Sequence, residues 1–172
     1  NRAPAQSYLD ALELLASLGI LAILLGIATP AFRRQLAVSA VDSAASQMLA
    51  GLALARRTAL TTGLPATFCL TGNGSTCALN GTDWMLFTNH PQGVDSRREP
   101  DEPFLWQEPL PRGVRGSGTR GYATYLARPR AASTLTFTFC HDALPQRRRS
   151  VVVSQTGRPR LVRTSDGSGR CA

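Results

Sequence analysis

Residues 12–34 read Leu12-Glu13-Leu14-Leu15-Ala16-Ser17-Leu18-Gly19-Ile20-Leu21-Ala22-Ile23-Leu24-Leu25-Gly26-Ile27-Ala28-Thr29-Pro30-Ala31-Phe32-Arg33-Arg34. The nineteen residues from Leu14 to Phe32 carry no charge, and Glu13 and Arg33 border them. About 20 apolar residues in an α-helix cross the ~30 Å hydrocarbon layer of a bilayer. A signal-peptide core is shorter than this. The stretch therefore predicts a membrane-spanning helix.

A single carboxylate, that of Glu13, stands at the start of this apolar helix. A carboxylate in lipid is costly unless it has a partner, so Glu13 is a functional candidate. The sequence from Leu12 to Pro30 closely resembles the N-terminus of type IV pilins and type II secretion pseudopilins. The resemblance implies that Glu13 pairs with the amino terminus of a neighbouring subunit during filament assembly. Family precursors have Gly and then Phe or Met at the positions of Tyr8 and Leu9, so cleavage and methylation there stay open.

The sequence continues as an amphipathic helix over residues 31–62. Its apolar residues recur at spacings of three or four, which predicts that one helix face packs on a folded body. These residues are Val41, Ala45, Met48, Leu52, Ala55 and Ala59. Pro30 stands where the helix would leave the lipid, a natural point for a kink. Gly63 suits the position just past a helix end, and Pro65 prevents the helix from resuming.

After Gly63 the sequence changes to short runs of β-branched and aromatic residues. They predict seven strands, at residues 66–70, 84–88, 104–107, 123–127, 134–140, 151–154 and 159–163. Residues 90–103 look like a polar linker, and residues 112–121 look like a mobile loop. We expect Trp84 and Trp106 to lie in the core. The predicted fold is α+β, a long N-terminal helix packed on an antiparallel β-sandwich. Its parts are 1–30 (N-terminal segment and transmembrane helix), 31–63 (amphipathic half of the helix) and 64–172 (β-sandwich with a basic C-terminal hairpin).

This arrangement resembles the GspH/FimT branch of the pilin family over essentially the whole chain. The four cysteines, Cys69, Cys77, Cys140 and Cys171, allow three disulfide pairings. Cys69 and Cys77 bracket a turn-rich loop of seven residues, and a Cys140–Cys171 bridge would fix the tail to the sheet. The spacings contain no CxxC pair, which disfavours zinc. We therefore expect the Cys69–Cys77 and Cys140–Cys171 disulfides, formed in an oxidising periplasm, and no metal or cofactor.

Positive charge is concentrated in the C-terminal part of the chain. All 19 basic residues are Arg. Residues 1–102 contain seven Arg and eight acidic residues, whereas residues 103–172 contain twelve Arg and three acidic residues. This asymmetry points to a polyanionic partner, either nucleic acid or an anionic surface, and the alternative is a solvated basic face.

Residues 151–163 predict a strand, a tight turn and a second strand. Gly157 can adopt the positive φ of such a turn, and Pro159 exposes the edge of the sheet because it lacks a backbone donor. Gly157-Arg158-Pro159-Arg160 matches the GRxR pattern that FimT-like minor pilins use to bind DNA in natural transformation. Arg158 and Arg160 alternate, so in an extended segment they point to one face. The expected DNA-binding residues are Gly157, Arg158, Arg160, Arg163, Arg147, Arg148, Arg149 and Arg170.

The expected function is that of a type IV pilus minor pilin that binds extracellular DNA through its phosphates, without sequence preference, for uptake in natural transformation. The protein would be a single-pass inner-membrane protein with a periplasmic domain before assembly. Once assembled it would contact other pilin subunits through its N-terminal helix and be displayed outside the cell. The alternative is a structural GspH-type minor pseudopilin at the tip of a type II secretion pseudopilus, without DNA binding.

No catalytic group of residues accompanies these features. His90 and His141 lie near no nucleophile pattern. Glu99, Asp101 and Glu102 are interpreted as solvated loop charges rather than as an acid/base pair. The sequence therefore predicts no enzyme activity.

Overall fold

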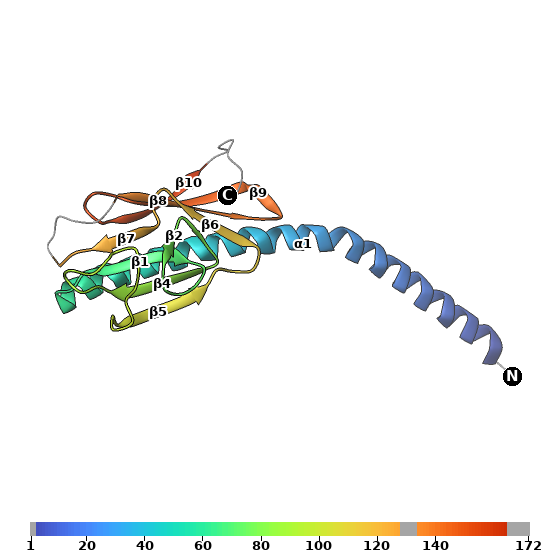
Figure 1. Cartoon of the computed structure of the whole chain (residues 1–172). Helices are drawn as coiled ribbons and strands as arrows, with labels where there is room; N and C mark the ends of the chain where they lie inside the picture. Colours follow the sequence, from blue (N-terminus) through green and yellow to red (C-terminus); the bar gives the residue numbers. More distant parts are fainter. Residues whose placement is uncertain (1–2, 128–133, 165–172) are drawn as a thin grey trace. The chain divides into compact units, whose positions relative to one another are not determined.

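The computed structural model describes residues 3–127 and 134–164 (Figure 1). The chain divides into two compact units, Asn1–Leu36 and Ala37–Ala172. The elements in chain order are α1 (Ala3–Thr62), β1 (Ala66–Thr71), β2 (Cys77–Ala78), β3 (Asn80–Gly81), β4 (Asp83–Thr88), β5 (Phe104–Pro109), β6 (Val114–Gly118), β7 (Tyr122–Tyr125), β8 (Leu135–His141), β9 (Leu144–Val153) and β10 (Pro159–Thr164).

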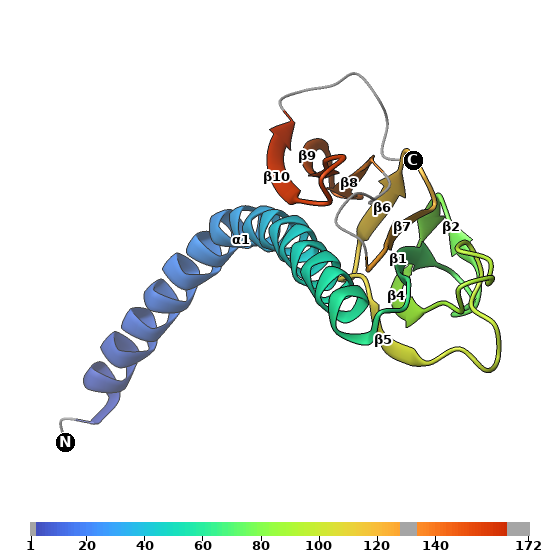
Figure 2. The ribbon, with the colours of Figure 1, turned by 90° about the vertical axis from the view of Figure 1, so that its left-hand side faces the viewer.

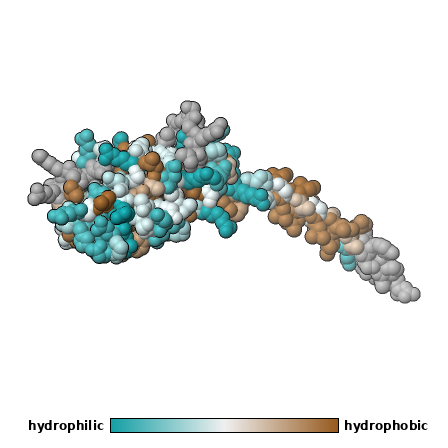
Figure 3. Space-filling model, viewed as in Figure 1, coloured by the Kyte–Doolittle hydropathy of each residue, from teal (hydrophilic) through white to brown (hydrophobic). Residues whose placement is uncertain are grey.

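The first unit is the N-terminal part of α1, and most of its described surface is apolar (Figure 3). Its large aliphatic side chains are more than half exposed, among them Leu15, Ile20, Ile23 and Ile27. By length and composition this helix can cross a membrane. The hydroxyls of Ser17 and Thr29 donate to the carbonyls of Leu14 (2.9 Å) and Leu25 (2.6 Å). The helix thus satisfies these polar groups internally, as a hydrocarbon environment requires.

The second half of α1 packs its predicted face into the core of the second unit. The six residues of that face are at most 1% exposed, namely Val41, Ala45, Met48, Leu52, Ala55 and Ala59. The helix ends at Thr62, and Gly63 follows with a φ of 73°. The Gly63 N–H donates to the carbonyl of Ala59 (3.1 Å). This left-handed end favours glycine, so the predicted helix end is confirmed.

Two five-stranded antiparallel sheets form the rest of the second unit (Figure 2). The first has the order β2-β1-β4-β5, with β7 also paired to β1. The second has the order β10-β9-β8-β6-β3, which makes β10 an edge strand. Both sheets and α1 share one core. Trp84 of the first sheet meets Phe139 of the second edge to face, with ring centroids 5.6 Å apart. The predicted α+β sandwich is confirmed.

The assignment of residues 112–121 to a mobile loop is wrong, because β6 runs through them between β8 and β3. Gly116 and Gly118 are the cause of the error. A Cβ at Gly116 would lie 2.9 Å from the ring of Phe139, and one at Gly118 would lie 3.0 Å from the ring of Phe137. These glycines let aromatic rings close over the strand, although their composition is typical of a loop.

The first half of β9 was also missed, since the strand begins at Leu144 and not at Val151. The two-residue strands β2 and β3 were not predicted. The two tryptophans lie as expected. Trp84 is fully buried, and the half-buried Trp106 packs against the core.

Candidate functional site

The β9–β10 hairpin contains the predicted tight turn. Five residues join the two strands. The Gly157 N–H donates to the Ser154 carbonyl (2.8 Å), and the Ser154 N–H donates to the Arg158 carbonyl (3.2 Å). Gly157 has a φ of 72°, in the region that favours glycine. The turn is therefore closed by its own hydrogen bonds and holds Arg158 at the end of the sheet.

Both arginines of the predicted motif are exposed. Arg158 lies in the turn, and Arg160 lies on the edge strand β10. Within the described parts of the chain, neither forms an ion pair. Pro159 begins β10 and leaves the edge without one backbone donor. Two guanidinium groups, each with five N–H donors, thus face solvent, one from the turn and one from the edge strand.

Arg160 shares one face of the second sheet with two other arginines. Arg160 aligns with Val152 of β9. Arg148, four residues before Val152, aligns through Cys140 of β8 with Arg115 of β6. Residues an even number apart on a strand point to the same side. We call this side the outer face, because the opposite side carries the core residues Leu135, Phe137, Phe139, Val151 and Val153.

Arg149 does not belong to this face, and its position does not favour the DNA-binding role that the sequence predicts for it. Its side chain is only 11% exposed and points to the core side, where it pairs with Asp42 of α1. The Arg149 Nε donates to Asp42 Oδ1, and its Nη2 donates to Oδ2 (3.4 Å). A covered guanidinium that already holds a carboxylate is not available to a phosphate.

The other predicted arginines fall into three groups. Arg147 is exposed and Arg148 is half-exposed, so both can face a ligand. Arg163 lies in β10, in register with Arg149. Arg170 lies outside the described residues. Arg115 is not among the residues predicted from the sequence. It alternates along β6 with Gly116 and Gly118, which face the core, and this alternation is the sequence signal for an outward Arg115.

Arg115 forms an exposed ion pair with Asp142, which lies just after β8. The Arg115 Nε and Asp142 Oδ1 are 2.6 Å apart, and the side chains are 60% and 52% exposed. Both residues also line an open hollow of about 600 Å³. The pair therefore borders open space and can be reached by a ligand.

The predicted Cys69–Cys77 disulfide is present, with the two Cα atoms 5.5 Å apart. It closes the loop between β1 and β2. Cys140 is also disulfide-bonded. Cys171, which we expected as its partner, lies outside the described residues.

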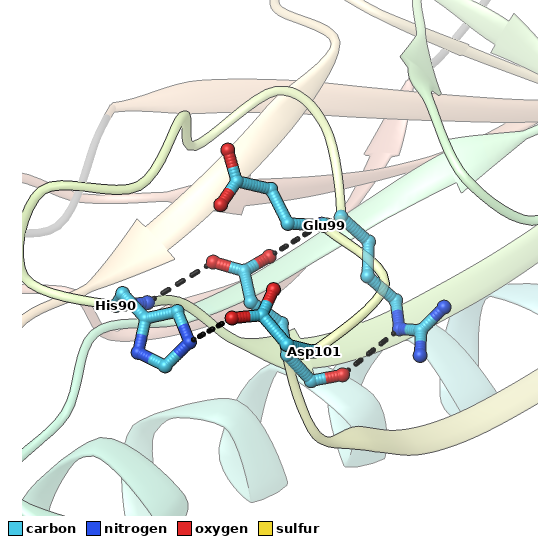
Figure 4. A network of polar contacts seen from close by, with 5 residues as sticks. His90, Glu99 and Asp101 are labelled. Carbon is cyan, nitrogen blue, oxygen red and sulfur yellow. Dashed lines mark hydrogen bonds and ion pairs between the residues drawn. The ribbon is translucent and has the colours of Figure 1, made fainter.

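The acidic loop between β4 and β5 is a structural network (Figure 4). Glu102 is only 1% exposed, so its description as a solvated charge is wrong. Its carboxylate accepts the N–H groups of His90 (3.0 Å) and Glu99 (2.8 Å), while Arg98 donates to its carbonyl (3.1 Å). The carboxylate thus satisfies backbone donors of a long loop. The exposed His90 and Asp101 side chains meet at 3.1 Å.

The family described as "Type II transport protein GspH" matches residues 44–157, which is more than half of the chain. The chain belongs to the GspH family. The matched region begins on the buried face of α1 and ends at Gly157 in the hairpin. No curated protein matches the sequence of this GspH-family chain.

Two solved structures have the same fold as this GspH-family protein. One is the type IV minor pilin FimU of Pseudomonas aeruginosa, with a TM-score of 0.57 and 18% identity over 77% of this chain and 95% of FimU. The other is the minor pseudopilin EpsH from the Type 2 Secretion System of Vibrio cholerae, with a TM-score of 0.52 and 13% identity over 72% of this chain and 96% of EpsH. At such identities the likeness shows the fold alone.

Membership of the GspH family fixes the class of function. The protein is a minor pilin or pseudopilin of a type IV pilus or of type II secretion, a structural and non-enzymatic subunit. The family implies assembly with other pilin subunits. The apolar N-terminal helix is consistent with anchoring in the inner membrane before assembly.

Proposed function

We propose that this GspH-family protein is a type IV pilus minor pilin that binds extracellular DNA without sequence preference, for uptake in natural transformation. The observation that carries the proposal is the exposed pair Arg158 and Arg160. Arg158 lies in a hydrogen-bonded turn and Arg160 on the edge strand β10 that follows it, and neither has an acidic partner among the described residues.

The chemistry of the pair suits a phosphate backbone. A guanidinium offers a planar fork that contacts two phosphate oxygens at once, which an ammonium cannot do. The turn fixes the backbone of Arg158, so less conformational freedom is lost on binding. The excess of Arg in residues 103–172 adds long-range attraction for a polyanion. Such phosphate contacts position a protein on nucleic acid, and they do not depend on the base sequence.

The proposed function also assigns a place to each part of the chain. Residues 1–30 hold the N-terminal segment and the membrane helix, residues 31–63 link it to the sandwich, and residues 64–172 form the periplasmic domain. Before assembly the protein is a single-pass protein of the inner membrane. In the filament, Glu13 pairs with the amino terminus of a neighbouring subunit, and the sandwich is displayed outside the cell.

The experiment compares the full chain in neutral detergent with its Arg158→Ala/Arg160→Ala variant, using fluorescence anisotropy of a labelled random duplex. Charge-assisted hydrogen bonds contribute about 1.5–3 kcal/mol each, and solvent exposure places these at or below the low end. The affinity should fall about tenfold to a hundredfold. The slope of log K against log salt should shrink by about 0.9 for each lost phosphate contact.

Arg33→Ala/Arg34→Ala is the matched control, because it removes the same charge at the membrane boundary. It should change the affinity little. Equal losses from both variants would mean that general charge, and not the hairpin, binds DNA. A wild-type protein without measurable affinity at low salt would end the proposal and favour the structural GspH-type pseudopilin.

A further inference from the structure

We infer that the end of the second unit at which α1 enters is a lipid-binding surface, which holds anionic phospholipid headgroups through Arg112 and Arg147 before assembly. The partner is the membrane that contains the protein's own N-terminal helix. This inference rests on that helix spanning the membrane, and it does not depend on DNA binding.

Two connections meet at this end of the second unit, which we call the anchor-side end. They are the β5–β6 loop, residues 110–113, and the β8–β9 turn, residues 142–143. The Asp142 N–H donates to the carbonyl of Gly113 (2.9 Å) and so joins the two connections. Figure 1 shows both toward the end of the unit where α1 enters, with the β9–β10 turn at the opposite end.

The ion pair of Arg149 with Asp42 holds β9 against the first turns of the packed part of α1. Asp42 follows Ala37, the first residue of the unit, by five residues, which is about 7.5 Å along the helix. In one direction from Arg149, β9 continues to the buried Val151. In the other direction it leads to its exposed start, and Arg147 lies there about 7 Å from Arg149 along the strand.

The connection between the anchor-side end and the apolar helix is short. Phe32 ends the uncharged run, and Ala37 begins the second unit. Five helical residues span about 7.5 Å, close to the thickness of one headgroup layer, about 5–7 Å. Whatever the angle between the two units, the anchor-side end therefore cannot move far from the headgroups. A DNA duplex, whose major groove alone is about 12 Å wide, does not fit between the two.

The side chains at the anchor-side end suit anionic headgroups. Arg112 and Arg147 are exposed, and neither forms an ion pair within residues 3–127 and 134–164. Asp142, the one acidic residue of the two connections, is already paired with Arg115. A guanidinium fork matches the phosphate of a lipid headgroup, and an anionic leaflet attracts each arginine that lies close to it.

Site-resolved labelling of arginines in the full chain tests the inference. The chain is reconstituted in nanodiscs of pure phosphatidylcholine, or of phosphatidylcholine with phosphatidylglycerol, and treated with phenylglyoxal before peptide mass spectrometry. A guanidinium held by a headgroup phosphate is less free to react. Labelling of Arg112 and Arg147 should therefore fall about threefold to tenfold in the anionic nanodiscs.

The same chain contains matched control arginines. Arg57 is exposed and lies about 30 Å along α1 from Ala37, much more than one Debye length. Arg120 is also exposed and follows the other end of β6. Labelling of both should change less than about twofold between the two lipid compositions.

A pair of double variants provides a second measurement. In the wild type, hydrogen exchange over residues 110–114 and 142–148 should slow about threefold when phosphatidylglycerol is present, because headgroup contact shields these backbone amides. Arg112→Ala/Arg147→Ala should abolish this difference. Arg57→Ala/Arg120→Ala removes the same charge and should retain it. Tryptophan fluorescence checks that each variant is folded, and the labelling of the wild type stays informative if a variant is not.

The outcomes separate this inference from the proposed function. Equal labelling of Arg112 and Arg147 in both lipid compositions, or equal slowing of exchange in the wild type and in Arg112→Ala/Arg147→Ala, overturns the lipid-binding surface. So does a DNA duplex that protects both arginines in pure phosphatidylcholine as strongly as phosphatidylglycerol does, because this end would then bind nucleic acid. A chain that shows the lipid effect but does not bind DNA overturns the proposed function alone.

Discussion

Replacing Asp42 by Asn tests whether Arg149 has a structural role. Asp42 lies on α1, and its two carboxylate oxygens accept hydrogen bonds from Arg149 on β9. The Arg149 side chain is 11% exposed, whereas that of Asp42 is 45% exposed. Asp42→Asn keeps the shape of the side chain but leaves a covered guanidinium without its counter-ion.

The size of the effect follows from this uneven burial. Removing one partner of a fully buried ion pair costs about 3–5 kcal/mol. Water reaches Asp42 and screens the pair, so we expect about 1–2 kcal/mol. For a unit the size of Ala37–Ala172, each kcal/mol lowers the melting temperature by roughly 3–4 °C. The expected decrease is therefore about 3–8 °C.

The assay is a thermal melt of the full chain in detergent, followed by the fluorescence of the buried Trp84 and the half-buried Trp106. The affinity for duplex DNA should change less than about twofold. Arg148→Ala on the same strand should behave in the opposite way, with an unchanged melt and a weaker affinity. An unchanged melt for Asp42→Asn, or an Arg149→Ala loss of affinity equal to that of Arg148→Ala, would refute the reasoning.

Three further predictions concern other parts of the chain. Burial raises the pKa of Tyr125 to about 12, although Arg56 acts to lower it. This neutral form contributes its full stability below the unfolded pKa of about 10. Roughly 2 kcal/mol of that stability is lost as the pH rises from 10 to 12. Phenolate absorbance should show this late titration, and Tyr125→Phe should remove the alkaline loss without lowering the melting temperature at neutral pH, because the hydroxyl has no hydrogen-bond partner among the described residues. Non-reducing peptide mapping should recover Cys69–Cys77 and Cys140–Cys171 peptides, and a Cys69–Cys140 peptide would contradict this pairing. Glu13→Ala should leave membrane insertion intact and reduce incorporation into filaments, measured in sheared pili; normal incorporation would make the carboxylate incidental.

The features that could be predicted from the sequence are those that depend on neighbouring residues. The buried face of α1 follows from helical periodicity, so six residues spaced three or four apart sufficed to place it. Gly63 and Gly157 both adopt the positive φ expected of them, because turn geometry is set within a few residues. The Cys69–Cys77 disulfide closes a short loop and is local in the same sense.

The features that were missed depend on contacts between distant segments. The glycines of β6 look like loop residues until the rings of Phe137 and Phe139 are placed beside them. Glu102 looks solvated until the path of its loop brings the N–H of His90 to its carboxylate. The partners that bury these positions, the two Phe rings and His90, lie too far along the sequence for a local pattern to indicate them.

The three consecutive arginines 147–149 show how a strand distributes charge. Adjacent strand residues point to opposite faces, so the three cannot act as one cluster. Arg149 points to the core side and pairs with Asp42, whereas Arg148 aligns with the distant Arg115 across β8. Each of Arg149 and Arg115 pairs with an aspartate, yet only the second pair is exposed on both sides. The covered Arg149–Asp42 pair therefore stabilises the fold more than the exposed Arg115–Asp142 pair, because water screens an ion pair that is exposed on both sides.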